Sequence, residues 1–98
     1  MGWQLIEMAR DKQVHLDLIC LFGSYAKGQA RADSDIDLAL VSRDFHSDKF
    51  ENNVAMNLLA SSIDPRIEVI TFDIDEYLDV NNPSPILAEI KKYGIPLF

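Results

Sequence analysis

Three short blocks of apolar residues stand out along this chain, separated by stretches in which apolar residues recur at helical spacing. Each block has the length and the aliphatic or β-branched content of a buried strand. The predicted strands cover residues 16–22, 35–42 and 66–72. The other stretches predict helices over residues 3–14 and 48–61. Helices and strands therefore follow one another along most of the sequence, as in folds that mix the two.

Residues that cap helices mark several boundaries. Ser47 or Asp48 is expected to begin the second helix, because both side chains can accept a hydrogen bond from the free N–H groups of a first turn. A final helix is predicted after Ser84, which caps it, with Pro85 in its first position. Gly94 is expected to end this helix.

Shorter elements complete the predicted order. A helical turn begins at Ser24, whose hydroxyl could cap it, and ends near Gly28. An acidic helical turn is predicted over residues 73–79, and Ile95–Phe98 is expected to add a short edge strand. Together these elements predict a single domain over residues 1–98 with an α/β fold, in which helices cover a small mixed β-sheet.

A glycine-serine turn stands shortly before a pair of acids. Gly23-Ser24 follows the first predicted strand, and its backbone N–H groups and hydroxyl could hold phosphate oxygens. Asp35 and Asp37 open the second predicted strand, so their side chains project from the same face. Two neighbouring carboxylates repel each other unless a cation offsets their charge. The pair therefore predicts a magnesium site.

The acidic segment has two other interpretations. In the first, Asp33 and Asp35 only initiate turns. In the second, residues 33–37 begin an EF-hand calcium loop, since their order, Asp-Ser-Asp-Ile-Asp, imitates its first five positions. The sixth position is Leu38 instead of glycine, and the twelfth is Asp44 instead of glutamate. A calcium loop is therefore disfavoured.

The motif that runs from Gly23-Ser24 to Asp35-Ile36-Asp37 resembles the signature of the nucleotidyltransferase superfamily that includes DNA polymerase beta. The chain is most similar to the minimal, single-domain members of that superfamily, and the resemblance extends to the ending Ile90–Phe98, which looks like their last helix and strand. It implies a polymerase beta-like fold. It also implies an enzyme that transfers a nucleoside monophosphate, most readily AMP from ATP, to a hydroxyl group.

The same resemblance implies roles for individual residues. Gly23 and Ser24 would bind the terminal phosphates of the triphosphate, and Lys27 would add positive charge to them. Arg31 is a second cation that could do so, although both cations could equally be solvated. The acid pair of the motif would hold two magnesium ions.

A third acid is expected on the strand over residues 66–72, and Glu68 is the best match. By resemblance, Glu68 would bind one metal ion and help to deprotonate the attacking hydroxyl. The alternative is that Glu68 is an exposed acid paired with Arg66. Asp64 and Asp73, just before and just after the strand, are the other candidates.

Composition limits the partners of this domain. The chain has 9 basic and 16 acidic residues and a formal charge of −7, which disfavours a nucleic-acid substrate. Cys20 is its only cysteine, so it cannot form an intramolecular disulfide. No secretory signal or apolar run of membrane-spanning length is present, and we therefore expect a cytoplasmic location without membrane attachment.

The sequence offers no obvious acceptor-binding domain. Minimal members of the superfamily are commonly antitoxins of small helical HEPN-type proteins, and some transfer AMP to a tyrosine of that partner, so the resemblance implies such a partner here. The alternative is a binding module that keeps the fold and neutralises or scaffolds a partner without turnover. Trp3, Met8 and Phe50 are predicted to belong to the core or to an interface. The oligomeric state is left open.

Overall fold

The computed structural model describes residues 2–46 and 48–97. Its elements alternate much as predicted, and their bounds are α1 Gly2–Asp11, β1 Leu18–Phe22, α2 Gly23–Ala26, β2 Ile36–Ser42, α3 Lys49–Ile63, β3 Ile67–Asp73, α4 Ile74–Leu78, α5 Pro85–Tyr93 and β4 Ile95–Pro96. The four strands form one sheet in the order β3-β2-β1-β4. The predicted fold class, a small mixed sheet covered by helices, is confirmed.

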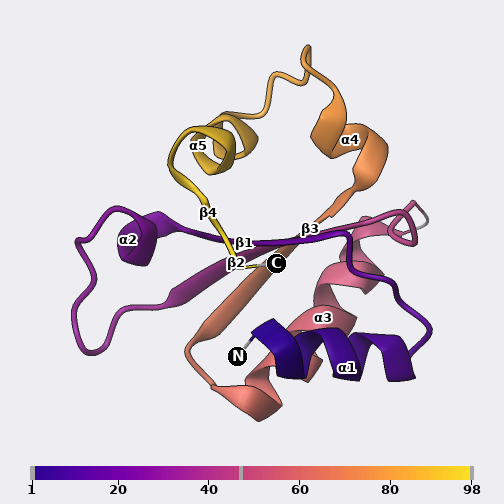
Figure 1. Cartoon of the computed structure of the whole chain (residues 1–98), viewed down its shortest axis with the longest axis horizontal. Coiled ribbons are helices and arrows are strands. Elements are labelled where there is room, and N and C mark those ends of the chain that lie inside the picture. The colour runs from indigo at the N-terminus through magenta and orange to yellow at the C-terminus, as the bar shows by residue number, and fades with distance from the viewer. Residues whose placement is uncertain (1, 47, 98) are drawn as a thin grey trace.

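The sheet combines both pairing directions. β1 runs antiparallel to β2 and to β4, whereas β2 and β3 are parallel. Parallel neighbours need a long crossover, and α3 provides it. The short loop from α2 to β2 instead returns the chain beside β1, so the end of β1 and the start of β2 meet at one end of the sheet (Figure 1).

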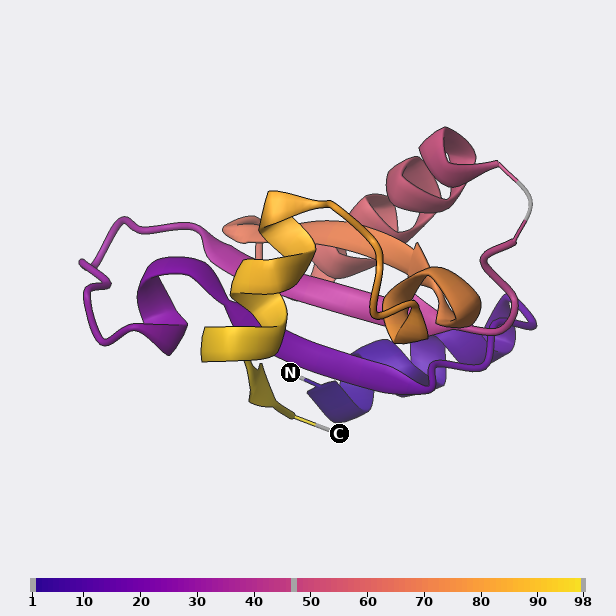
Figure 2. The ribbon, with the colours of Figure 1, turned by 90° about the horizontal axis from the view of Figure 1, so that it is seen from above.

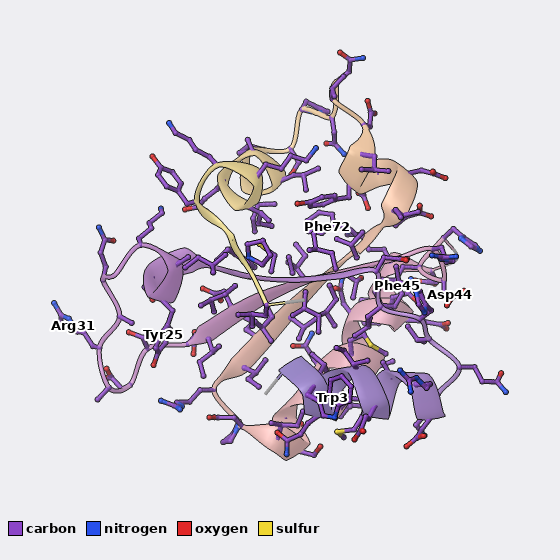
Figure 3. The ribbon with its side chains drawn as sticks, viewed as in Figure 1. Trp3, Tyr25, Arg31, Asp44, Phe45 and Phe72 are labelled. Atoms are coloured by element: carbon purple, nitrogen blue, oxygen red, sulfur yellow. The ribbon has the colours of Figure 1, made fainter. Side chains whose placement is uncertain are left out.

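Helices cover both faces of the sheet. α1 and α3 lie on one face, and α4 and α5 lie on the other (Figure 1). The face towards α1 and α3 carries the larger core, built from apolar residues of both helices and all three long strands, including Leu5, Ile19, Leu38, Met56 and Val69. The other face carries a smaller core with Cys20, Val41, Phe72, Leu87 and Ile90. Figure 3 shows Phe72 between the sheet and the helices α4 and α5.

Several boundaries differ from the prediction, and the largest difference is at the end of the first helix. Helix α1 ends at Asp11, not at residue 14, because Gln13 adopts the left-handed conformation with φ of 64° and reverses the chain. Val14 still packs against the core, which explains why its apolar side chain fitted the helical pattern. Strand β2 begins at Ile36, one residue after Asp35.

The structure distinguishes among the predicted caps. Asp48 caps α3, since its Oδ1 accepts a hydrogen bond from the Glu51 N–H at 3.2 Å, while Ser47 lies outside the described residues. Ser84 caps α5 by accepting a hydrogen bond from the Leu87 N–H at 3.3 Å. The hydroxyl of Ser24 does not cap α2, which has Phe22 at its N-cap position.

Two of the three residues expected in the core or at an interface are exposed. Trp3 and Phe50 have relative exposures of 69% and 76%, so their assignment to the core was wrong, while an interface role remains a prediction. Met8 is half-buried. Within the described ranges, no helix has the length and apolar character that crossing a membrane requires.

Candidate active site

The sheet brings the predicted acids to one end of the molecule. In the register of β2 with its neighbours, Asp37 lies opposite Phe22 of β1 and opposite Glu68 of β3. Gly23-Ser24 follows Phe22 directly, so the glycine-serine turn begins beside Asp37. Asp35 lies one residue before β2 and is exposed. The acids and the turn, which are separated along the chain, therefore meet where β1 ends and β2 begins.

Strand alternation places these acids on the α4 and α5 side of the sheet. Asp37 shares its face with Ala39 and Val41, and Glu68 shares its face with Ile70 and Phe72, all of which belong to or pack against the smaller core. Figure 2 shows α5 crossing the strands near α2, whereas α4 lies towards the opposite end. The carboxylates therefore lie on the face of the sheet that α5 crosses.

Gly23 is fitted closely against Asp37. Its φ of 71° lies in the left-handed region, which favours glycine. A Cβ atom at this position would collide with Oδ2 of Asp37 and approach its Cγ to 3.1 Å. The turn thus requires glycine both for its conformation and for the space that the Asp37 carboxylate occupies.

The Asp37 carboxylate carries uncompensated charge. Burial raises its pKa above the ordinary value, and the charges of Glu68, Asp35 and Glu89 raise it further. No hydrogen bond or ion pair from residues 2–46 or 48–97 reaches the Asp37 side chain. A partly buried carboxylate surrounded by three other acids is a site that a cation would stabilise.

The described side chains do not by themselves enclose a metal ion. Among them, no three histidine, cysteine, aspartate or glutamate side chains are grouped closely enough to hold one. Asp35 and Glu68 are both exposed, and neither side chain makes a hydrogen bond to another described residue. The donor set itself, carboxylate oxygens with unbalanced negative charge, is nevertheless the kind that magnesium prefers.

A cavity of about 420 Å³ opens beside these acids. Its lining residues are Phe22, Asp37, Asn53, Glu68, Val69, Ile70 and Ile86. Glu68 lines this cavity, whereas Asp64 and Asp73, the other candidates for the third acid, do not. Sequence reasoning did not find Asn53 and Ile86, because they reach the cavity from helices α3 and α5 and belong to no motif.

The other candidate acids have structural partners. Asp64 accepts hydrogen bonds from Arg66, including one from Nη2 at 2.8 Å, so the suggested pairing of Arg66 with Glu68 was wrong. Asp73 caps α4 by accepting a hydrogen bond from the Asp75 N–H at 2.8 Å.

The predicted phosphate-binding residues lie on α2 and the loop after it. The Ser24 hydroxyl makes no hydrogen bond with another described residue, which leaves it free to bind a ligand. Lys27 forms an ion pair with Glu89 of α5, and its Nζ lies 5.2 Å from the centre of the Tyr93 ring. Arg31 points away from the sheet at the far end of this loop (Figure 3).

The fold and this arrangement identify the class of protein. The chain belongs to the polymerase beta nucleotidyltransferase family, whose model, described as "Polymerase beta, Nucleotidyltransferase", matches residues 4–98. This confirms the resemblance to minimal nucleotidyltransferases. Protein adenylyltransferase MntA of Shewanella oneidensis is a relative, 34% identical over 86 residues that make up 88% of this chain and 55% of MntA. The chain thus spans just over half the length of that curated relative.

Solved structures of toxin–antitoxin assemblies share the fold. A toxin–antitoxin structure with AMP-PNP contains a chain that is 28% identical, with a TM-score of 0.61 over 97% of this chain and 70% of that one. A chain in a mutant of the toxin–antitoxin MntA-HpeT has 27% identity and a TM-score of 0.63. This match covers all of the present chain and 73% of the other.

Proposed function

We propose that this chain transfers AMP from ATP to a hydroxyl group of a protein, using magnesium held by Asp35, Asp37 and Glu68. The observation that carries the proposal is the Asp37 carboxylate, which lies against the Gly23 turn with other acids around it, and with which no cationic side chain of the described residues is paired. Membership of the nucleotidyltransferase family supports the reaction class.

Each residue has a distinct part in the proposed reaction. The Ser24 hydroxyl and the N–H groups of its turn bind the phosphates that leave. Two bound magnesium ions would offset the charge of the carboxylates and of the triphosphate and make the α-phosphorus easier to attack. The hydroxyl oxygen forms a bond to the α-phosphorus and its proton passes to Glu68. The bond from the α-phosphorus to the bridging oxygen breaks, and pyrophosphate leaves.

The proposed acceptor is a protein. The net charge of −7 opposes binding to a nucleic-acid backbone. A relative is named a protein adenylyltransferase, and similar solved chains belong to toxin–antitoxin assemblies. Together with the resemblance to minimal members of the superfamily, these names lead us to infer a small helical partner of the HEPN type, with this chain acting as its antitoxin in the cytoplasm.

The nucleotide site can be tested without knowledge of the acceptor. Isothermal titration with ATP in the presence of magnesium should show binding by the wild type. The double substitution Asp35→Asn and Asp37→Asn should weaken it by about 100-fold or more, since the metal-mediated contacts contribute several kcal/mol. Asp17→Asn, which removes a carboxylate at the other end of the sheet, is the matched control and should bind like the wild type. Equal metal-dependent binding by the wild type and the double variant would contradict the site.

Turnover needs a second experiment. The protein encoded beside this chain is incubated with it and Mg-ATP, and mass spectrometry should then show AMP on the partner. Glu68→Gln should bind ATP but modify the partner at least about 100-fold more slowly, because a general base contributes roughly 10²–10⁴-fold. If the wild type adds nothing but still neutralises the partner, the chain is a binding module. If Glu68→Gln reacts at the wild-type rate, Glu68 is not the base.

A further inference from the structure

Helix α3 satisfies the free edge of β3 with a row of polar side chains. β3 is one of the two outer strands of the sheet, so the N–H and C=O groups along its free edge lack a strand partner. Asn57 Oδ1 accepts a hydrogen bond from the Val69 N–H at 2.8 Å, and Asn53 Oδ1 accepts one from the Thr71 N–H at 2.8 Å. Lys49 Nζ donates to the Thr71 carbonyl at 2.6 Å. These three side chains follow a spacing of four residues, one helical turn apart.

Asn57 uses both the oxygen and the nitrogen of its side-chain amide in hydrogen bonds to described residues, whereas Asn53 uses only the oxygen. Asn57 Nδ2 donates to the carbonyl oxygens of Asn53 and Val69, at 2.7 and 3.0 Å. Asn53 Oδ1 also accepts from the Thr71 hydroxyl at 3.0 Å, so both acceptor sites of its oxygen are occupied. The Thr71 N–H can only face an oxygen, which fixes the orientation of the Asn53 amide. In the part of the chain that the structure describes, no acceptor receives a hydrogen bond from Asn53 Nδ2.

Asn53 lines the same cavity as Asp37 and Glu68. This cavity extends across Asp37, from Phe22 beside the Gly23-Ser24 turn to Glu68 and Asn53 on the β3 side. In phosphoryl transfer the attacking and leaving oxygens lie roughly in line on opposite sides of the phosphorus. If the leaving phosphates bind at the turn, the attacking hydroxyl enters from the β3 end of the cavity, which Asn53 lines.

We propose that Asn53 binds the substrate that receives AMP. Its Nδ2 donates a hydrogen bond to the oxygen of the attacking hydroxyl. This inference rests on the proposed function. With one lone pair of the hydroxyl oxygen held by Asn53, its O–H bond is directed at Glu68 and its other lone pair at the α-phosphorus. As the new O–P bond forms, the proton passes to Glu68, the bond to the bridging oxygen breaks, and pyrophosphate leaves. Asn53 gives up no proton in this step.

Three variants separate the proposed role of Asn53 in binding the attacking hydroxyl from its structural role at the edge of β3. Asn53→Ala removes the donor and the contacts with Thr71, Asn53→Asp removes the donor but keeps an acceptor for Thr71, and Asn57→Ala is the matched control on the same helix. The probes are N-acetyltyrosinamide and N-acetylserinamide, with radiolabelled ATP and magnesium. Both Asn53 variants should lower kcat/KM for the better probe by about tenfold, the effect of one lost hydrogen bond, while their Mg-ATP affinity stays within about twofold of the wild type. Asn57→Ala should lower the unfolding temperature but leave kcat/KM unchanged.

A binding measurement tests Asn53 apart from turnover. The side-chain amide signals of Asn53 and Asn57 are followed by NMR while either probe is added to the complex with magnesium and α,β-methylene-ATP, which cannot transfer AMP. The Asn53 signal should shift and the Asn57 signal should not. Wild-type Mg-ATP binding without transfer to any acceptor would contradict the proposed function, whereas an unshifted Asn53 signal would overturn the role of Asn53. A rate loss in Asn53→Asp alone would also overturn it, because the added charge and not the missing donor would then be the cause.

Discussion

Carboxylates in two regions of this molecule have opposite electrostatic surroundings. Asp17, before β1, binds Arg43 through a hydrogen bond of 2.7 Å, and this contact lowers the pKa of Asp17. Asp64, before β3, binds Arg66, which lowers the pKa of Asp64 to about 2. Asp37 is instead surrounded by acids, and its pKa is raised. The first two carboxylates stabilise the loops that they join, whereas the third is kept in an environment that the fold alone does not favour.

The difference does not come from a shortage of nearby cations. Arg66 lies two residues from Glu68, yet its guanidinium binds Asp64 and donates to the carbonyl of Ala32 at 3.3 Å. Lys27 lies four residues from Gly23 and binds Glu89. Both cations are thus paired with acids other than Asp35, Asp37 and Glu68, so these three carboxylates keep their negative charge for a bound cation.

The largest effect is expected from filling the space beside Asp37. Gly23→Ala should lower the free energy of unfolding by about 2–4 kcal/mol, because alanine is strained at φ of 71° and its Cβ would displace the Asp37 carboxylate. Gly28→Ala is the control, since Gly28 has φ of 69° but no atom within 4 Å of the position that a Cβ would take, and it should cost only about 1 kcal/mol. Urea unfolding followed by far-ultraviolet circular dichroism measures both. Equal losses would mean that Asp37 does not occupy the space beside the turn.

Replacing a carboxylate of each kind by its amide should change the free energy of unfolding by a smaller amount and in opposite directions. At pH 7, Asp37→Asn should raise the free energy of unfolding by about 0.5–1 kcal/mol, because it removes repulsion, and Asp17→Asn should lower it by about 1 kcal/mol. The Asp37 pKa is raised by folding, so its stabilising contribution is present at low pH and is lost as pH rises through the folded-state pKa. The Asp17 pKa is lowered, so its contribution is present at neutral pH and is lost as pH falls below the ordinary value of 3.8.

Unfolding of the wild type and both variants between about pH 2.5 and pH 7 would test these signs. The two differences from the wild type should both shrink towards the acid end of the range, where the carboxylates of the folded and unfolded chains become protonated. A loss of stability in both variants at pH 7 would mean that Asp37 has a stabilising partner in solution, as Asp17 does.

How much the sequence could predict depends on whether residues meet through local or distant structure. The turn at Gly23-Ser24 and the acids at 35 and 37 are separated by one short loop, so their fixed spacing and the resemblance to nucleotidyltransferases were enough to predict that they lie together. Arg66 was misjudged because it precedes β3, where alternation does not yet apply, and its side chain turns back to Asp64. Asn53 could not be found at all, since it reaches the cavity only through the packing of α3 beside β3.

The smallest expected effect concerns the ion pair between Lys27 and Glu89. Glu89 binds Lys27, like a structural acid, but it also raises the pKa of Asp37. Because Lys27 is already engaged, Lys27→Ala should weaken Mg-ATP binding by only about two- to threefold. Glu89→Gln should strengthen binding by a similar factor, since it frees Lys27 and removes one negative charge near the phosphates. Isothermal titration of both single variants and of the double variant measures this. If Lys27 turns to the phosphates, Glu89→Gln should improve binding less in the Lys27→Ala background than in the wild type, whereas identical gains in both would assign Glu89 an effect on the acid cluster alone.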